Sequence, residues 1–187
     1  MDYICKKLSK CVAIFYKARR KLPHSCLISL YYSIAYPYFI YCNHVWGNNY
    51  KTVLEKLMLV QKKIIRIITC SPYRAHTEPL FVANQILTVY DINIYTVGIF
   101  MYNTISSDVP TIFTSFFIQN DDIHEHATRT SLNLHLPPWK INVRKFNIRY
   151  NGAIVWNSLP AYIKQSQSLM IFKRVFRKYL NDLKCKI

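Results

Sequence analysis

The stretch LYYSIAYPYFIYCNHVWG, residues 30–47, decides how this chain folds. It lies inside a longer window, residues 22–50, that contains no Lys, Arg, Asp or Glu. A bilayer span needs about 20 consecutive apolar residues, so a window of this length could cross a membrane. It could equally form the interior of a small helical domain. The polar and aromatic residues of the window distinguish between these two interpretations.

The composition of the window favours a buried helical interior. Tyrosines occur along its whole length, whereas the tyrosines of membrane helices prefer the two interfaces. Pro37 interrupts its middle, Asn43 and His44 add polar groups, and basic residues flank both ends. We therefore expect two buried helices that meet near Tyr36 and Pro37, with the phenol hydroxyls reaching the edge of the core. A membrane protein that uses window 22–50 is the alternative.

Amphipathic helices are predicted on either side of this window. Apolar residues that recur every three or four positions predict a helix over residues 3–21 and another over 52–69. The inward stripe of the second helix is predicted to consist of Leu54, Leu57, Met58, Gln61, Ile64, Ile65 and Ile68. Residues 90–105 also favour a helix, Thr77 to Pro79 can start a short one, and Ser168 is a candidate cap of the last helix.

The composition becomes more polar after residue 117, and residues 119–131 indicate a surface loop. Apolar and polar residues alternate over 132–136 and over 146–150, which predicts two short strands that pair as a β-hairpin. Asn151 and Gly152 form a turn signal, and the segment after them favours either a return strand or a short helix. The sequence thus predicts a mainly α chain, with a helical domain at 1–117 and a small α+β region at 118–187 that holds the hairpin and a C-terminal helix.

The charge of the chain points to a polyanionic partner. There are 25 Lys and Arg residues against 9 Asp and Glu residues, a net charge of +16. An excess this large indicates nucleic acid or an anionic membrane surface, and a generic basic surface is the alternative. The candidate nucleic-acid-binding residues are Lys6, Lys10, Lys17, Arg19, Arg20, Lys21, Lys62, Lys63, Arg66, Arg74, Arg144, Arg149, Lys173, Arg174, Arg177 and Lys178.

Residue patterns that carry chemistry are scarce. The adjacent acids Asp121 and Asp122 lie in the polar loop, not in the apolar hairpin that holds the metals of a polymerase. His24 with Cys26, and Cys42 with His44, resemble pairs of metal ligands, but both pairs sit in the apolar window. The six cysteines form no regular framework, so we expect free thiols in a reducing compartment. We predict no enzymatic activity, no metal and no cofactor; an unrecognised metal-dependent enzyme is the alternative.

Four ordered stretches resemble a known family. They are YICKKLSKCVAIFYKAR (3–19), LPHSCLISLYYSIAYPYFIYCNHVWG (22–47), LEKLMLVQKKIIRIITCSPYRAHTEPLF (54–81) and FNIRYNGAIVWNSLP (146–160). Together they look like the region downstream of the polymerase core in reverse transcriptases of jockey-like retrotransposons, which lack long terminal repeats. The resemblance covers about residues 3–180.

The resemblance implies a thumb-like helical bundle and the region that follows the thumb. In such proteins the thumb holds the primer–template duplex against the palm, which carries the catalytic aspartates. The chain departs from the full pattern because it contains neither the polymerase core nor the endonuclease, so independent catalysis is not expected. The implied partners are an RNA/DNA hybrid or duplex, bound largely without sequence specificity, and the polymerase core of a full-length parent protein. An intracellular location, nuclear or cytoplasmic, is implied, with no membrane contact.

Overall fold

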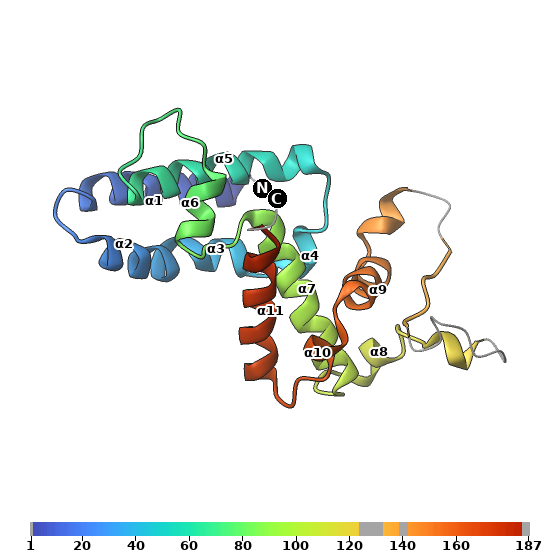
Figure 1. The fold of residues 1–187 in the computed structure, drawn as a ribbon. Helices are drawn as coiled ribbons and strands as arrows, with labels where there is room; N and C mark the ends of the chain where they lie inside the picture. The colour runs from blue at the N-terminus through green and yellow to red at the C-terminus, as the bar shows by residue number, and fades with distance from the viewer. Residues whose placement is uncertain (1, 124–132, 139–141, 185–187) are drawn as a thin grey trace. The chain divides into compact units, whose positions relative to one another are not determined.

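The computed structural model describes residues 2–123, 133–138 and 142–184, and over these ranges the chain is mainly α-helical (Figure 1). It divides into two compact units. The first contains Met1–Asn43, Asn49–Asn93 and Leu180–Ile187, and the second contains His44–Asn48 and Ile94–Tyr179. The domain boundary that composition predicts after residue 117 falls inside the second unit, and it remains a prediction.

Two long helices form the frame of the first unit. Helix α1 (Asp2–Ala18) packs against α5 (Lys51–Ile68), and the two run side by side in Figure 1. Leu8 and Phe15 of α1 are fully buried, as are Ile64 and Leu57 of α5. The predicted inward stripe of α5 is confirmed in full, and Ile67 is buried as well. The three-to-four-residue spacing of apolar side chains therefore identified the packed faces correctly.

Residues 24–40 of the uncharged window contribute one buried face to the interior of this unit. Helix α2 (His24–Leu30) continues through a π-helical turn, η1 (Tyr31–Ala35), into α3 (Tyr36–Ile40). Tyr31 and Phe39 are almost completely buried. The predicted helical and partly buried character of this segment is confirmed, but instead of two helices that meet near Tyr36 and Pro37 there is one continuous helical path through η1. Over the described residues, no helix is both long and apolar enough to cross a membrane.

Pro37 explains why the π-helical turn occurs here. Proline has no N–H and its ring clashes with the carbonyl of the residue four positions earlier in a regular α-helix. In η1 the backbone N–H of Tyr36 donates to the carbonyl of Tyr31, five positions earlier, which widens the turn directly before the proline. The chain therefore passes Pro37 without ending the helical path.

Short elements complete the first unit. Helix α6 (Glu78–Ala83) starts at the predicted Thr77–Pro79 signal, and α7 (Val89–Ile105) begins in this unit and continues in the second. At the start of α7, the backbone N–H of Thr88 donates to the Asp91 carboxylate at 2.9 Å, and Asp91 N–H donates to the Thr88 hydroxyl at 3.3 Å. This reciprocal cap satisfies two donors that the helix itself leaves without partners.

The second unit is also helical. It holds α4 (Asn43–Trp46) from His44 onward, residues 94–105 of α7, α8 (Thr111–Thr114), α9 (Ile148–Ser158), α10 (Ala161–Lys164) and residues 169–179 of α11 (Leu169–Lys184). Its core is aromatic: the Phe172 ring stacks on Tyr102 with centroids 4.5 Å apart, and Trp156 lies 6.2 Å from Phe172. The Ser168 hydroxyl accepts from Ile171 N–H at 3.3 Å, as the predicted cap of α11 requires.

The predicted β-hairpin is wrong. Asn142–Phe146 form a 3₁₀ helix, η3, and residues 148–150 are the first turn of α9. The side chain of Asn147 accepts a hydrogen bond from Arg149 N–H at 3.0 Å, so this residue is a helix N-cap. The alternation around Asn147 therefore belongs to a helix start, and the predicted Asn151-Gly152 turn lies inside α9.

The other predicted strand leaves a single bridge. Leu134 forms an isolated antiparallel bridge with Gln119, and the Asn157 side chain bonds both backbone groups of Leu134 at 2.9 Å. Leu132 lies outside the described residues. The segment after Gly152 takes the helical alternative and ends at Ser158, before Leu159 and Pro160.

Candidate nucleic-acid interface

The packing of α1 on α5 brings Arg19, which directly follows α1, and two cations of α5 around one cleft. We name it the basic cleft; its volume is about 180 Å³. Its lining residues are Tyr16, Arg19, Lys63, Arg66, Ile67, Ser71 and Tyr73. Three cationic side chains and no carboxylate occur among these described lining residues. A polyanion would meet attraction here without local opposition from negative charge.

The loop after α5 forms one side of the basic cleft and is tied to the helix. Arg66 Nε donates to the carbonyl of Ala75 at 3.0 Å, and Ser71 N–H donates to the carbonyl of Arg66 at 2.9 Å. The hydroxyls of Thr69 and Ser71 lie 2.8 Å apart. These bonds hold the residues around Tyr73 close to the end of α5.

The end of α1 forms the opposite side. The Arg19 guanidinium lies 4.4 Å from the centroid of the Tyr16 ring, a cation–π contact. Lys17, Arg20 and Lys21 are exposed in the same region of the chain, and Arg74 is exposed in the loop after α5. The structure thus places Arg19, Lys63 and Arg66 at one cleft.

A second groove lies along the middle of α1. It is lined by Lys7, Lys10, Cys11 and Ile14 of α1, and by Ser33, Ile34, Pro37 and Tyr38. Lys6 is exposed on the same helix. Lys7 was not among the predicted residues. Its spacing of three from Lys10, which places both on one side of a helix, was the available signal.

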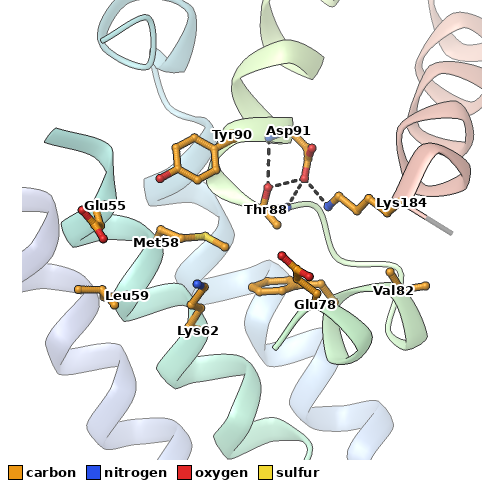
Figure 2. A pocket seen from close by; sticks show the side chains of 11 residues that line it. Glu55, Met58, Leu59, Lys62, Glu78, Val82, Thr88, Tyr90, Asp91 and Lys184 are labelled. Carbon is orange, nitrogen blue, oxygen red and sulfur yellow. Dashed lines mark hydrogen bonds and ion pairs between the residues drawn. The ribbon is translucent and has the colours of Figure 1, made fainter. Parts of the chain in front are cut away.

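Lys62 occupies a different environment from its neighbour Lys63. It is half-buried and lines a cavity of about 440 Å³ together with Glu55, Glu78 and Asp91 (Figure 2). We call this the mixed-charge cavity. Met58, Leu59, Phe81 and Val82 supply its apolar lining. The candidate residues Lys62, Lys63 and Arg66 of α5 are therefore divided between a cavity lined with carboxylates and a cleft lined with none among its described residues.

An ion pair closes one side of the mixed-charge cavity. Lys184 near the end of α11 pairs with Asp91 at the start of α7, and Figure 2 shows both beside Thr88. Both side chains are largely buried, with 21% and 17% of their surfaces exposed. Asp91 is paired in this way, and Glu55 and Glu78 are the other acidic residues that line the cavity with Lys62.

The second unit presents its own cations. On α11, Lys173, Arg174 and Lys178 are exposed and Arg177 is half-buried, while Phe172 and Phe176 are buried on the opposite side. The helix is therefore amphipathic as predicted. The exposed Arg149 places its guanidinium 3.7 Å from the Phe116 ring centroid. Arg144 lies in η3, and its side chain falls outside the described part of the structure.

The histidines of the two His–Cys pairs make contacts other than metal ligation. His24 Nε2 lies 2.7 Å from Asn84 Oδ1, and its Nδ1 lies 3.3 Å from the carbonyl of Ile68. The His44 ring stacks on Phe100 with centroids 5.7 Å apart, and burial lowers the pKa of His44. Within the described residues, no three His, Cys, Asp or Glu side chains are grouped closely enough to hold a metal ion. The five described cysteines are free thiols.

Comparison with known proteins gives no match: no protein-family model, no curated protein and no solved structure is similar to this chain. The resemblance to retrotransposon reverse transcriptases therefore remains a prediction. Inference about function starts from the basic cleft and the exposed cations, because these are the features in which several predicted residues come together.

Proposed function

We propose that this chain is a non-catalytic nucleic-acid-binding module. It corresponds to the thumb and the following region of a jockey-like retrotransposon reverse transcriptase. One observation carries the proposal: α1 and α5 place Arg19, Lys63 and Arg66 around a cleft whose described lining contains no carboxylate. In a chain with a net charge of +16, such a cleft attracts the phosphates of a nucleic acid backbone.

The expected ligand is an RNA/DNA hybrid or a duplex. Lysine and arginine contacts to phosphates position a protein on nucleic acid but carry no sequence information, so binding is weakly sequence-selective. In a protein of the type that the resemblance implies, the helical bundle holds this duplex next to the polymerase core, which supplies the catalytic aspartates. Such a partner is found inside the cell, in the nucleus or the cytoplasm.

A salt titration of two double variants tests the proposal. The first is Arg19→Ala with Lys63→Ala, which removes two cations of the basic cleft. The matched control is Lys51→Ala with Lys56→Ala, which removes two exposed cations from the opposite end of α5. Both variants have the same net charge, so total charge does not distinguish them; Lys56 also pairs with Asp2 at 3.6 Å, an exposed ion pair of small energetic weight.

The affinity for a labelled RNA/DNA hybrid is measured over a range of salt concentrations. Each phosphate contact contributes about 0.9 to the slope of log affinity against log salt. For the cleft variant, the slope is expected to decrease by nearly twice this amount, because two phosphate contacts are lost. The control is expected to keep the slope of the parent chain. Absence of binding by the parent chain, or equal loss in both variants, would contradict the proposal.

A further inference from the structure

The basic cleft has aromatic rings as well as cations. Tyr73 is 83% exposed and Tyr16 is 50% exposed, and both line the cleft. Single exposed apolar residues are common on proteins and need no explanation. Two exposed tyrosines at one cleft with three cations are a different feature, because aromatic faces beside positive charge are the components of single-strand-binding surfaces.

The two rings have different surroundings. The guanidinium of Arg19 lies 4.4 Å from the Tyr16 centroid and covers one face of that ring. Tyr73 lies in the loop between Cys70 and His76, and hydrogen bonds from Arg66 and Ser71 tie this loop to α5. Tyr73 is therefore the more accessible ring, and it is displayed on a loop whose backbone is held in place.

The size of the cleft limits what can occupy it. At about 180 Å³ it is smaller than the roughly 300 Å³ at which pockets for drug-sized ligands begin. A single planar ring lying against its open side fits this space better than an enclosed organic ligand. In a duplex, base faces are stacked on one another and are not available to a side chain, whereas unpaired bases can stack on an aromatic ring.

We propose that the basic cleft is a stacking site for single-stranded nucleic acid. An unpaired base stacks on Tyr73, and the flanking phosphates contact Arg19 and Lys63. This inference rests on the proposed function and adds a ligand class to it: the unpaired strand next to a duplex, bound through base faces in addition to phosphates. Stacking of this kind is tolerant of sequence, because every base has a π face.

The test separates ring from charge. Fluorescence anisotropy is measured with single-stranded RNA, single-stranded DNA and a blunt duplex of the same length, for the parent, Tyr73→Ala and Tyr73→Phe. The control is Tyr162→Ala, which removes a tyrosine that is 59% exposed in the second unit. Tyr73→Ala is expected to weaken single-strand binding by about fivefold or more, the effect of losing one base stack.

The expected results for the other variants and for the duplex follow from the same reasoning. Tyr73→Phe keeps the parent affinity because stacking uses the ring and not the hydroxyl, Tyr162→Ala changes nothing, and duplex affinity stays within about twofold in every variant. An unchanged single-strand affinity in Tyr73→Ala overturns the stacking site, as does an equal loss on duplex. In both cases the proposed function still stands if Arg19→Ala with Lys63→Ala lowers the salt slope more than Lys51→Ala with Lys56→Ala does. If the parent binds none of the three nucleic acids, the proposed function fails first.

Discussion

The side-chain oxygen of Gln61 accepts a hydrogen bond from the backbone N–H of Val89 at 2.9 Å, inside the core of the first unit. The amide nitrogen of the same side chain donates to the carbonyl of Leu87 and to the hydroxyl of Tyr31, each at 2.9 Å. One buried amide therefore joins α5, the π-helical turn and the start of α7. The Tyr31 hydroxyl that was expected at the edge of the core is instead bonded in its interior.

Replacement of Gln61 by methionine should destabilise the protein. The volume is nearly kept, but the N–H of Val89 and the carbonyl of Leu87 lose their partner in a buried place. Each such unsatisfied group costs about 1–3 kcal/mol. Urea unfolding of Gln61→Met is compared with that of Gln165→Met, which changes an exposed glutamine. Equal unfolding midpoints would show that the Gln61 amide does not support the core.

Lys62 and Lys63 should differ in their contribution to nucleic-acid binding although they are adjacent. Lys63→Ala removes a cation from the basic cleft and is expected to lower the salt slope by about 0.9. Lys62→Ala removes a cation that lies among carboxylates, so the slope should not change. Salt titrations of both single variants against one RNA/DNA hybrid make the comparison. Equal slopes for the two would mean that Lys62 also reaches the phosphates.

Replacement by alanine should destabilise the protein more at Gly98 than at Gly152. A Cβ atom at Gly98 would overlap the ring of Phe176, which is fully buried and cannot move aside. Overpacking of this kind costs about 1–3 kcal/mol. At Gly152 the nearest atom is the Met101 sulfur at 2.6 Å; Met101 is buried as well, but its side chain is flexible, and alanine gains up to about 1 kcal/mol of helix propensity, so the net loss of stability should be smaller. Thermal melts of Gly98→Ala and Gly152→Ala should therefore shift by clearly different amounts, and a similar shift in both would be inconsistent with this packing.

Stability should fall in mild acid, in part because of His44. Burial lowers the pKa of His44 in the folded state from its ordinary value of 6.5. Below pH 6.5 the unfolded chain binds a proton at this residue that the folded chain binds only at lower pH, so protonation favours unfolding. The contribution of His44 to stability is thus fully present above that pH and is lost as the pH falls towards the folded pKa.

The measurement is the urea midpoint at several pH values for the parent chain and for His44→Phe. The phenylalanine keeps an aromatic ring for the contact with Phe100 but does not titrate. The variant is expected to lose less stability than the parent between neutral pH and mild acid. Parallel pH profiles would show that His44 is protonated equally in both states.

The sequence predicted the helices of the first unit because their apolar residues repeat over many turns. The inward stripe of α5 could be read directly, and Pro37 marked the place where the buried helical path changes. The β-hairpin failed because five alternating residues around Asn147 fit a strand and a helix start equally well. Only the cap formed by the Asn147 side chain distinguishes the two, and that bond depends on the folded backbone.

The cations of the candidate site could be predicted from the sequence, but their positions relative to one another could not. Nothing in the spacing of α1 or α5 indicates that Arg19 lies at the same cleft as Lys63, since this follows from how the two helices pack. The separate environment of Lys62 depends on the position of Glu78 in α6, which is likewise a tertiary contact. Nothing in the sequence indicated that Tyr73 belongs to the site, because a loop residue is not part of a periodic pattern.

The π-helical turn has a consequence for the phase of the buried helix. Leu27, Tyr31, Ala35 and Phe39 follow one another at intervals of four residues, and all four are buried. On a regular α-helix each interval of four overshoots a full turn by about 40°, so three intervals would carry Phe39 about 120° away from Leu27. The wider turn at Tyr31–Ala35 rotates less per residue, which reduces the angle between Leu27 and Phe39 about the helix axis. A strict four-residue repeat can thereby keep facing one core, and removal of a single residue from the turn would rotate Phe39 off that face.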